Sequence, residues 1–156
     1  MSLLKTLKYW LTPLKMTDLG FGTLTFIYVS QNPERSYWEC EWRFPSTGTV
    51  VLITLDGDES GPTAESRQFF LGLPGRFQQI LALCRPVLEQ VYKDEKHEPP
   101  PPDIFSLFKL SGFGVKDPRE NPIQWDVSFE TNGDDHLGVL IRFMGESAMP
   151  PEVDIC

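Results

Sequence analysis

The 156-residue chain has few of the residues that metal and catalytic sites use most often. It contains three cysteines and two histidines, and none of them has the spacing of a metal-ligand set. Cys40 and Cys84 fall on apolar faces of predicted elements, where cysteine behaves as a small hydrophobic residue. We therefore expect no metal and no cofactor, and we interpret the last residue, Cys156, as an exposed thiol.

Long apolar runs are also missing. A membrane-spanning helix needs about 20 consecutive apolar residues, and no segment of this sequence has that length. The first residues lack the unbroken apolar stretch and the small-residue cleavage site of a secretory signal. We expect a cytoplasmic protein, because a reducing compartment is the default for such a chain.

Basic residues are the third scarce class. The chain has 14 Lys and Arg against 22 Asp and Glu, which gives a formal net charge of −8. Phosphate binding needs clustered Lys and Arg, so this balance argues against a nucleic-acid partner. An acidic surface suits a basic protein partner, and it also serves solubility alone. Hydrophobic residues make up 40% of the chain, which is enough for a folded core.

A long helical segment separates two groups of predicted strands. From residue 77 the apolar residues recur with the spacing of one helix face, at Phe77, Ile80, Leu81, Cys84, Val87, Leu88 and Val91. Thr63 is a good N-cap for this segment, and Pro74 predicts a break into a short first helix and a longer second one. The apolar stripe must be buried against another element, and the flanking strands supply that surface.

Three strands are predicted before the helix pair and three after it. They occupy residues 21–29, 37–44, 49–55, 109–115, 123–129 and 137–143. The run at 49–55 is apolar on both faces, so we expect it at the centre of the sheet. The sequence therefore predicts an α+β fold, with an antiparallel sheet of about six strands and the helices packed on one face.

The first 15 residues differ in charge from the rest of the chain. They contain three lysines and no acid, so residues 16–156, which we expect to form a single domain, carry a net charge of −11. On a helical wheel the lysines share one side, and the apolar residues share another, at Leu3, Leu4, Leu7, Trp10, Leu11 and Leu14. The pattern predicts a basic amphipathic helix over residues 1–15.

Three interpretations of this helix are open. A short basic amphipathic helix can lie on an anionic membrane surface, here through Leu4, Leu7, Trp10 and Leu11. The helix can equally dock its leucines on the domain or on a second copy of the chain, which would give a homodimer. The third interpretation is a frayed end.

No catalytic set stands out. The segment Asp56–Gly61 resembles the first half of a calcium loop, but Pro62 and Arg67 occupy later ligand positions, so we interpret it as a polar turn. The acid–histidine cluster at Asp134, Asp135 and His136 is read as a solvated hairpin turn, with an enzymatic role as the weaker alternative.

Acidic and aromatic side chains gather on one predicted strand. In residues 37–44, Trp38, Cys40, Trp42 and Phe44 point inward by alternation. Their neighbours on the opposite face, with the loop at residues 56–59 beside them, form an acidic–aromatic surface that suits a basic protein partner. The candidate binding residues are Tyr37, Glu39, Glu41, Asp56, Asp58 and Glu59.

Three stretches, at residues 33–38, 57–62 and 112–131, read PERSYW, GDESGP and GFGVKDPRENPIQWDVSFET. In these stretches the chain resembles a family of small, acidic, uncharacterised bacterial proteins, a domain of unknown function. The likeness spans roughly residues 19–145. It implies a bacterial, cytoplasmic protein, and it carries over no catalytic motif and no site residue.

The leading hypothesis is a non-enzymatic, acidic protein-binding domain, with immunity-type and regulatory proteins as the candidate classes. It rests on the charge of residues 16–156 together with the lack of a catalytic set. The alternative is a peripheral membrane protein held by its basic amphipathic N-terminal helix.

Overall fold

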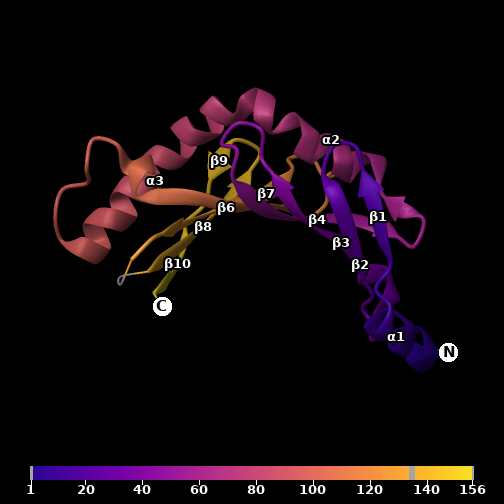
Figure 1. Ribbon diagram of the computed structural model, residues 1–156. Helices are drawn as coiled ribbons and strands as arrows, with labels where there is room; N and C mark the ends of the chain where they lie inside the picture. The colour runs from indigo at the N-terminus through magenta and orange to yellow at the C-terminus, as the bar shows by residue number, and fades with distance from the viewer. Residues whose placement is uncertain (1, 134–135, 156) are drawn as a thin grey trace. The chain divides into compact units, whose positions relative to one another are not determined.

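The computed structural model describes residues 2–133 and 136–155 (Figure 1). Asp134, Asp135 and Cys156 of the sequence predictions lie outside the described residues. The chain forms two compact units, residues 1–73 and 74–156. Each unit combines helix with sheet, which confirms the α+β class.

The first unit is built on strands that pair antiparallel in the order β1-β2-β3-β4. These strands are β1 (Lys15–Asp18), β2 (Gly22–Ile27), β3 (Tyr37–Arg43) and β4 (Val50–Asp58). A two-residue strand, β5 (Gly61–Pro62), folds back on the end of β4. A 3-10 turn, η1 (Pro33–Arg35), lies between β2 and β3.

Alternation along these strands forms the core face as predicted. The buried side chains are Leu24 and Phe26 of β2, Trp38, Cys40 and Trp42 of β3, and Val51, Ile53 and Leu55 of β4. Helix α2 (Ala64–Gly72) contacts β4 and contributes the buried Phe70. The predicted N-cap is confirmed, because the Thr63 hydroxyl accepts the Ser66 N–H at 3.2 Å.

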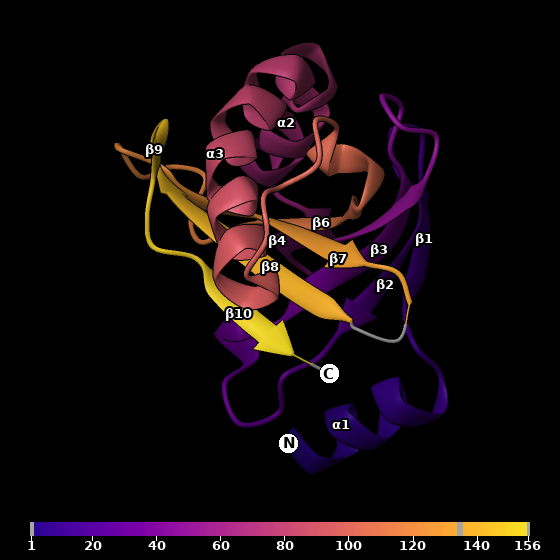
Figure 2. The ribbon, with the colours of Figure 1, turned by 90° about the vertical axis from the view of Figure 1, so that its left-hand side faces the viewer.

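The second unit pairs β6, β7, β8 and β10 antiparallel in that order. Their bounds are β6 (Phe108–Val115), β7 (Gln124–Thr131), β8 (Leu137–Met144) and β10 (Glu152–Ile155), and β9 (Ser147–Ala148) pairs with β8. Helix α3 (Phe77–Lys96) contacts β8 within this unit (Figure 2). Its buried residues are Phe77, Ile80, Cys84, Leu88 and Val91, so the predicted stripe is its packed face. A 3-10 turn, η3 (Ile104–Ser106), precedes β6.

The break predicted at Pro74 is confirmed. α2 ends at Gly72, a 3-10 turn η2 (Pro74–Arg76) follows, and α3 begins at Phe77. Proline lacks the backbone N–H that a continuing helix needs, and its ring clashes with the preceding turn. Pro86 lies inside α3, which continues through it.

Two details of the predicted sheet are wrong. The described ranges contain ten strands instead of six, because β1, β5, β9 and β10 are only two to four residues long and show no clear alternation. β4 is not buried on both faces, since its residues Val50 and Leu52 are each 49% exposed. The outer face of the first sheet is therefore open to solvent.

Candidate functional site

The first anchor of helix α1 (Ser2–Leu11) in the first unit is an aromatic side chain. Tyr9 is only 8% exposed. Its ring meets Phe26 edge-on at 5.5 Å between centroids and lies 5.4 Å from the ring of Tyr28, distances typical of stabilising aromatic pairs. Burial raises the pKa of the Tyr9 hydroxyl, and its hydrogen bond to Glu59 raises it further.

Glu59 is the second anchor of α1. Its carboxylate accepts from the Lys5 ammonium at 3.3 Å as well as from the Tyr9 hydroxyl. The hydrogen bond from Tyr9, and after it the one from Lys5, lowers the pKa of Glu59. Lys5 and Tyr9 are four residues apart and so share one face of the helix. This polar face is the side of α1 that contacts the unit.

The turn that carries Glu59 is held by hydrogen bonds on both sides. One Asp58 carboxylate oxygen accepts from the Ser60 hydroxyl and from the Ser60 N–H, the latter at 2.8 Å. The hydrogen bond from the hydroxyl, and after it the one from the N–H, lowers the pKa of Asp58. The Asp58 carbonyl accepts the Trp38 indole N–H at 2.8 Å. Glu59 therefore presents its carboxylate to α1 from a fixed position between β4 and β5.

The apolar side of α1 faces solvent. Its members are Leu3 at 81% exposure, Leu4 at 76%, Leu7 at 49%, Trp10 at 78% and Leu11 at 65%; we call them the α1 apolar face. At 3.6 residues per turn this face is centred opposite Lys5 and Tyr9. The interpretation in which the leucines dock on the domain is therefore wrong.

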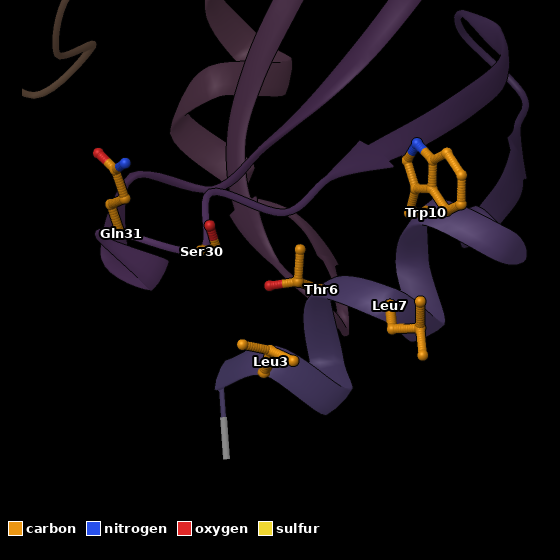
Figure 3. Close-up of a pocket in the computed structure, with 6 residues that line it drawn as sticks. All are labelled: Leu3, Thr6, Leu7, Trp10, Ser30 and Gln31. Carbon is orange, nitrogen blue, oxygen red and sulfur yellow. The ribbon is translucent and has the colours of Figure 1, made fainter.

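A groove of about 480 Å³ continues the α1 apolar face on one side (Figure 3). It is lined by Leu3, Thr6, Leu7 and Trp10 of α1 and by Ser30 and Gln31 of the loop after β2. The helix side of the groove is mainly apolar, and the loop side is polar and uncharged. The groove is an open cleft at the surface of the first unit.

The predicted helix boundary and anchor need correction. α1 ends at Leu11 instead of continuing to Lys15. Pro13 disfavours helical conformation in the residue before it and lacks the backbone N–H that a continuing helix needs. Leu14 and Lys15 are therefore outside the helix. Tyr9 was not predicted as an anchor because it lies outside the apolar stripe, and the docking interpretation placed that stripe against the domain.

Four of the predicted binding residues share the open outer face of the first sheet. Tyr37 of β3 lies opposite Asp56 of β4, and Glu39 and Glu41 follow along β3 on the same side. Glu59 does not join them, since it lies in the turn after β4 and pairs with Lys5. Asp58, the last residue of β4, accepts a hydrogen bond from Ser60 of that turn. Lys15 and Arg43 also lie on this outer side, so the face is less acidic than the sequence suggested.

No metal-binding cluster is found among the described residues, counting groups of three or more His, Cys, Asp and Glu. Burial raises the pKa of the Cys40 thiol to about 11 and that of Cys84 to about 12, so both are protonated at neutral pH and unreactive. Among the residues that the structure describes, no helix is both long enough and apolar enough to cross a membrane.

One carboxyl in the second unit is half-buried. Burial raises the pKa of Asp126, against the attraction of Arg142, whose guanidinium pairs with Glu152 at 2.5 Å. Gly114 leaves the space for it, because a Cβ there would come within 2.7 Å of an Asp126 carboxylate oxygen. A single carboxyl beside an ion pair does not form a base–acid pair.

Comparison with known proteins found no relative of this chain. No family model matches the chain, and no curated protein or solved structure is similar enough to count as one. The function is therefore inferred from the side chains themselves.

Proposed function

We propose that the protein associates reversibly with a lipid surface through the α1 apolar face. The observation that carries this proposal is the direction in which α1 is mounted. Its polar face, with Lys5 and Tyr9, holds the first unit, and its leucines and Trp10 face outward. An interfacial helix needs this arrangement, with its apolar side in the acyl region and its polar side toward water.

Because α1 is held through its polar face, the rest of the first unit lies on the polar side of the helix. A helix lying in the membrane interface would carry the unit on its water-facing side without rearrangement at Tyr9 or Glu59. A preformed, correctly oriented helix avoids most of the cost of folding on the surface, since isolated helices of this length are marginal in water.

The size of the apolar face supports reversible binding. Full burial of one leucine-sized side chain contributes about 1.5–3 kcal/mol, and the α1 apolar face has four leucines and one tryptophan. Partial insertion of these side chains is comparable to a single lipid anchor, which gives marginal and reversible association.

Replacing Leu3 and Leu7 together by glutamine is expected to weaken vesicle binding at least tenfold, or about 1.4 kcal/mol. Glutamine keeps a good helix propensity, so the loss reports the apolar surface and not the helix. The measurement is co-sedimentation of the full chain with vesicles that contain neutral and anionic lipids. Leu19→Gln is the matched control, because Leu19 is a fully exposed leucine of the same unit outside α1.

Two results would contradict the proposal. One is equal binding of the wild type, the double variant and the control. The other is a concentration-dependent dimer, measured by light scattering, that the Leu3/Leu7 double variant loses while the wild type binds no vesicle. That second result would assign the α1 apolar face to a second copy of the chain.

Protein binding on the outer face of the first sheet is a second candidate function. The observation in its favour is that Tyr37, Glu39 and Glu41 stand beside the half-exposed Val50 and Leu52 of the paired strand. Aromatic, acidic and aliphatic side chains on one open sheet face suit a partner with basic and apolar residues.

The test is charge reversal at Glu39→Lys together with Glu41→Lys. The wild-type chain is expected to capture one stoichiometric basic protein from the lysate of its native host at low salt, and the double variant is expected to capture at least tenfold less. Reversal at Glu95 and Glu120, two exposed acids of the second unit, should leave capture unchanged. Retention of the same partner by the Glu39/Glu41 variant would rule out this surface, and so would the absence of any enriched protein.

A further inference from the structure

We infer that the α1 apolar face selects loosely packed, strongly curved lipid surfaces, and that attraction to anionic lipid contributes little. This inference rests on the proposed lipid association and specifies the kind of surface recognised. It follows from where the fold puts the charges around α1. The sequence predicted an anionic surface because it shows three lysines in the first 15 residues, and the structure shows what surrounds each of them.

Lys5 is the lysine most directly offset. Its ammonium lies 3.3 Å from the Glu59 carboxylate, and both side chains are about half exposed. An ion pair at this distance presents almost no net charge to a surface several ångströms away, because the two fields cancel. Lys5 therefore adds little to attraction toward anionic headgroups as long as Glu59 is ionised.

The other two lysines do not form a basic cluster with it. The Lys8 ammonium lies 5.3 Å from the centroid of the Tyr9 ring and also interacts electrostatically with Glu59. Lys15 lies in β1, where it pairs with Thr25, and Thr25 in turn pairs with Glu39. Recognition of anionic lipid by charge typically uses four to eight clustered Lys and Arg. α1 offers only Lys5 and Lys8, and both interact with the same Glu59 carboxylate.

The rest of the chain is acidic. Residues 16–156 carry a net charge of −11, and Asp58, the last residue of β4, directly precedes Glu59. An anionic leaflet repels this charge within a Debye length, about 8 Å at physiological ionic strength. Electrostatics near α1 is therefore close to neutral at short range and repulsive for the protein as a whole.

The apolar side is large by comparison. Amphipathic helices with large apolar residues and few charges bind where gaps between headgroups expose acyl chains, and curvature opens such gaps. The α1 apolar face meets this description, with Trp10 and four leucines exposed. The groove beside it ends at Ser30 and Gln31, which are uncharged (Figure 3), so hydrogen bonding to headgroups there requires no anionic lipid.

Neutral phosphatidylcholine vesicles of two sizes test this directly. With equal accessible lipid, the full chain is expected to bind several-fold more to vesicles of about 30 nm than to vesicles of about 200 nm, because higher curvature exposes more acyl chain. Raising the salt concentration from 0.05 to 0.5 M should not release it, since apolar contacts are not screened. Adding phosphatidylserine to the large vesicles should give less than a twofold gain.

Glu59→Gln is expected to increase binding to anionic lipid. The glutamine keeps an oxygen that can accept the Tyr9 O–H, and it removes the negative charge that offsets Lys5. Binding to large vesicles containing phosphatidylserine should therefore rise about fivefold, which is the effect of one added positive charge near the surface. Glu65→Gln is the matched control, because it changes the net charge equally at an exposed site of α2. Equal effects of the two variants would contradict the offset of Lys5 by Glu59.

The outcomes separate the inference from the function it rests on. Binding that requires phosphatidylserine, disappears at high salt and ignores vesicle size would overturn the inference and leave lipid association intact. No binding to any vesicle, of either size or composition, would overturn the proposed function itself.

Discussion

Gly57→Ala is expected to destabilise the first unit by about 3 kcal/mol or more, at or beyond the upper end of the usual cost of overpacking. A Cβ on Gly57 would lie 2.3 Å from the Gly61 carbonyl oxygen and 2.8 Å from the Pro62 Cα. Both are backbone atoms, so no side-chain rotation can relieve the contact. β5 folds back on β4 at this point, and the strands approach too closely for any residue with a side chain.

The consequence reaches α1 through Glu59. The alanine would push β5 away from β4 and shift the turn between them, which carries the carboxylate that Lys5 and Tyr9 share. We therefore expect the variant to lose part of the attachment of α1 as well as global stability.

Urea unfolding followed by fluorescence measures the effect as a lower midpoint at an unchanged slope. Gly72→Ala is the control, since a Cβ there would meet no atom within 4 Å. Gly72 closes α2, where alanine should be neutral or stabilising by up to about 1 kcal/mol. A wild-type midpoint for Gly57→Ala would contradict the proposed close approach of the two strands.

The larger elements follow from periodicity because burial on one face forces a repeating pattern. β3 shows this best, with alternation from Trp38 through Trp42 matching the buried face. The division of the helical segment at Pro74 follows from proline's missing N–H. Strands β1, β5 and β9 were missed because strands of two to four residues complete too few repeats to show a pattern, and β1 has only Met16 as an apolar residue.

The orientation of α1 was not predictable from the same rules. Periodicity identified its apolar stripe correctly, but the usual inference that a stripe is buried gave the wrong attached face. The true anchor pairs Lys5 with Glu59, 54 positions away in the chain, and no local pattern indicates such a partner. The same contact explains why Glu59 does not belong to the acidic surface of Glu39 and Glu41.

Tyr9→Ala should release α1 from the first unit while leaving its lipid-facing side chains unchanged. Truncating a buried aromatic side chain costs about 3–5 kcal/mol, and here the loss falls on the contacts with Phe26 and Tyr28. A loss of about 3 kcal/mol corresponds to more than a hundredfold shift of the docking equilibrium. Since a free helix of ten residues is marginal in water, the released segment should also unfold there.

Hydrogen exchange of the α1 amides measures the release, and two neighbouring variants make it specific. Tyr9→Phe keeps the ring and loses the hydrogen bond to Glu59, so exchange should accelerate only by the equivalent of about 1 kcal/mol. Trp10→Ala removes a side chain that is 78% exposed, so it should leave exchange unchanged and weaken vesicle binding.

Tyr9→Ala is expected to show the opposite pattern from Trp10→Ala, with fast exchange and vesicle binding reduced much less than in the Leu3/Leu7 double variant. The reason is that Tyr9 belongs to the attached face of α1 and Trp10 to the outward face. If the two alanine variants change exchange and vesicle binding alike, α1 does not have separate faces for the protein and for the membrane. If they differ as expected, α1 binds the first unit through one face and lipid through the other.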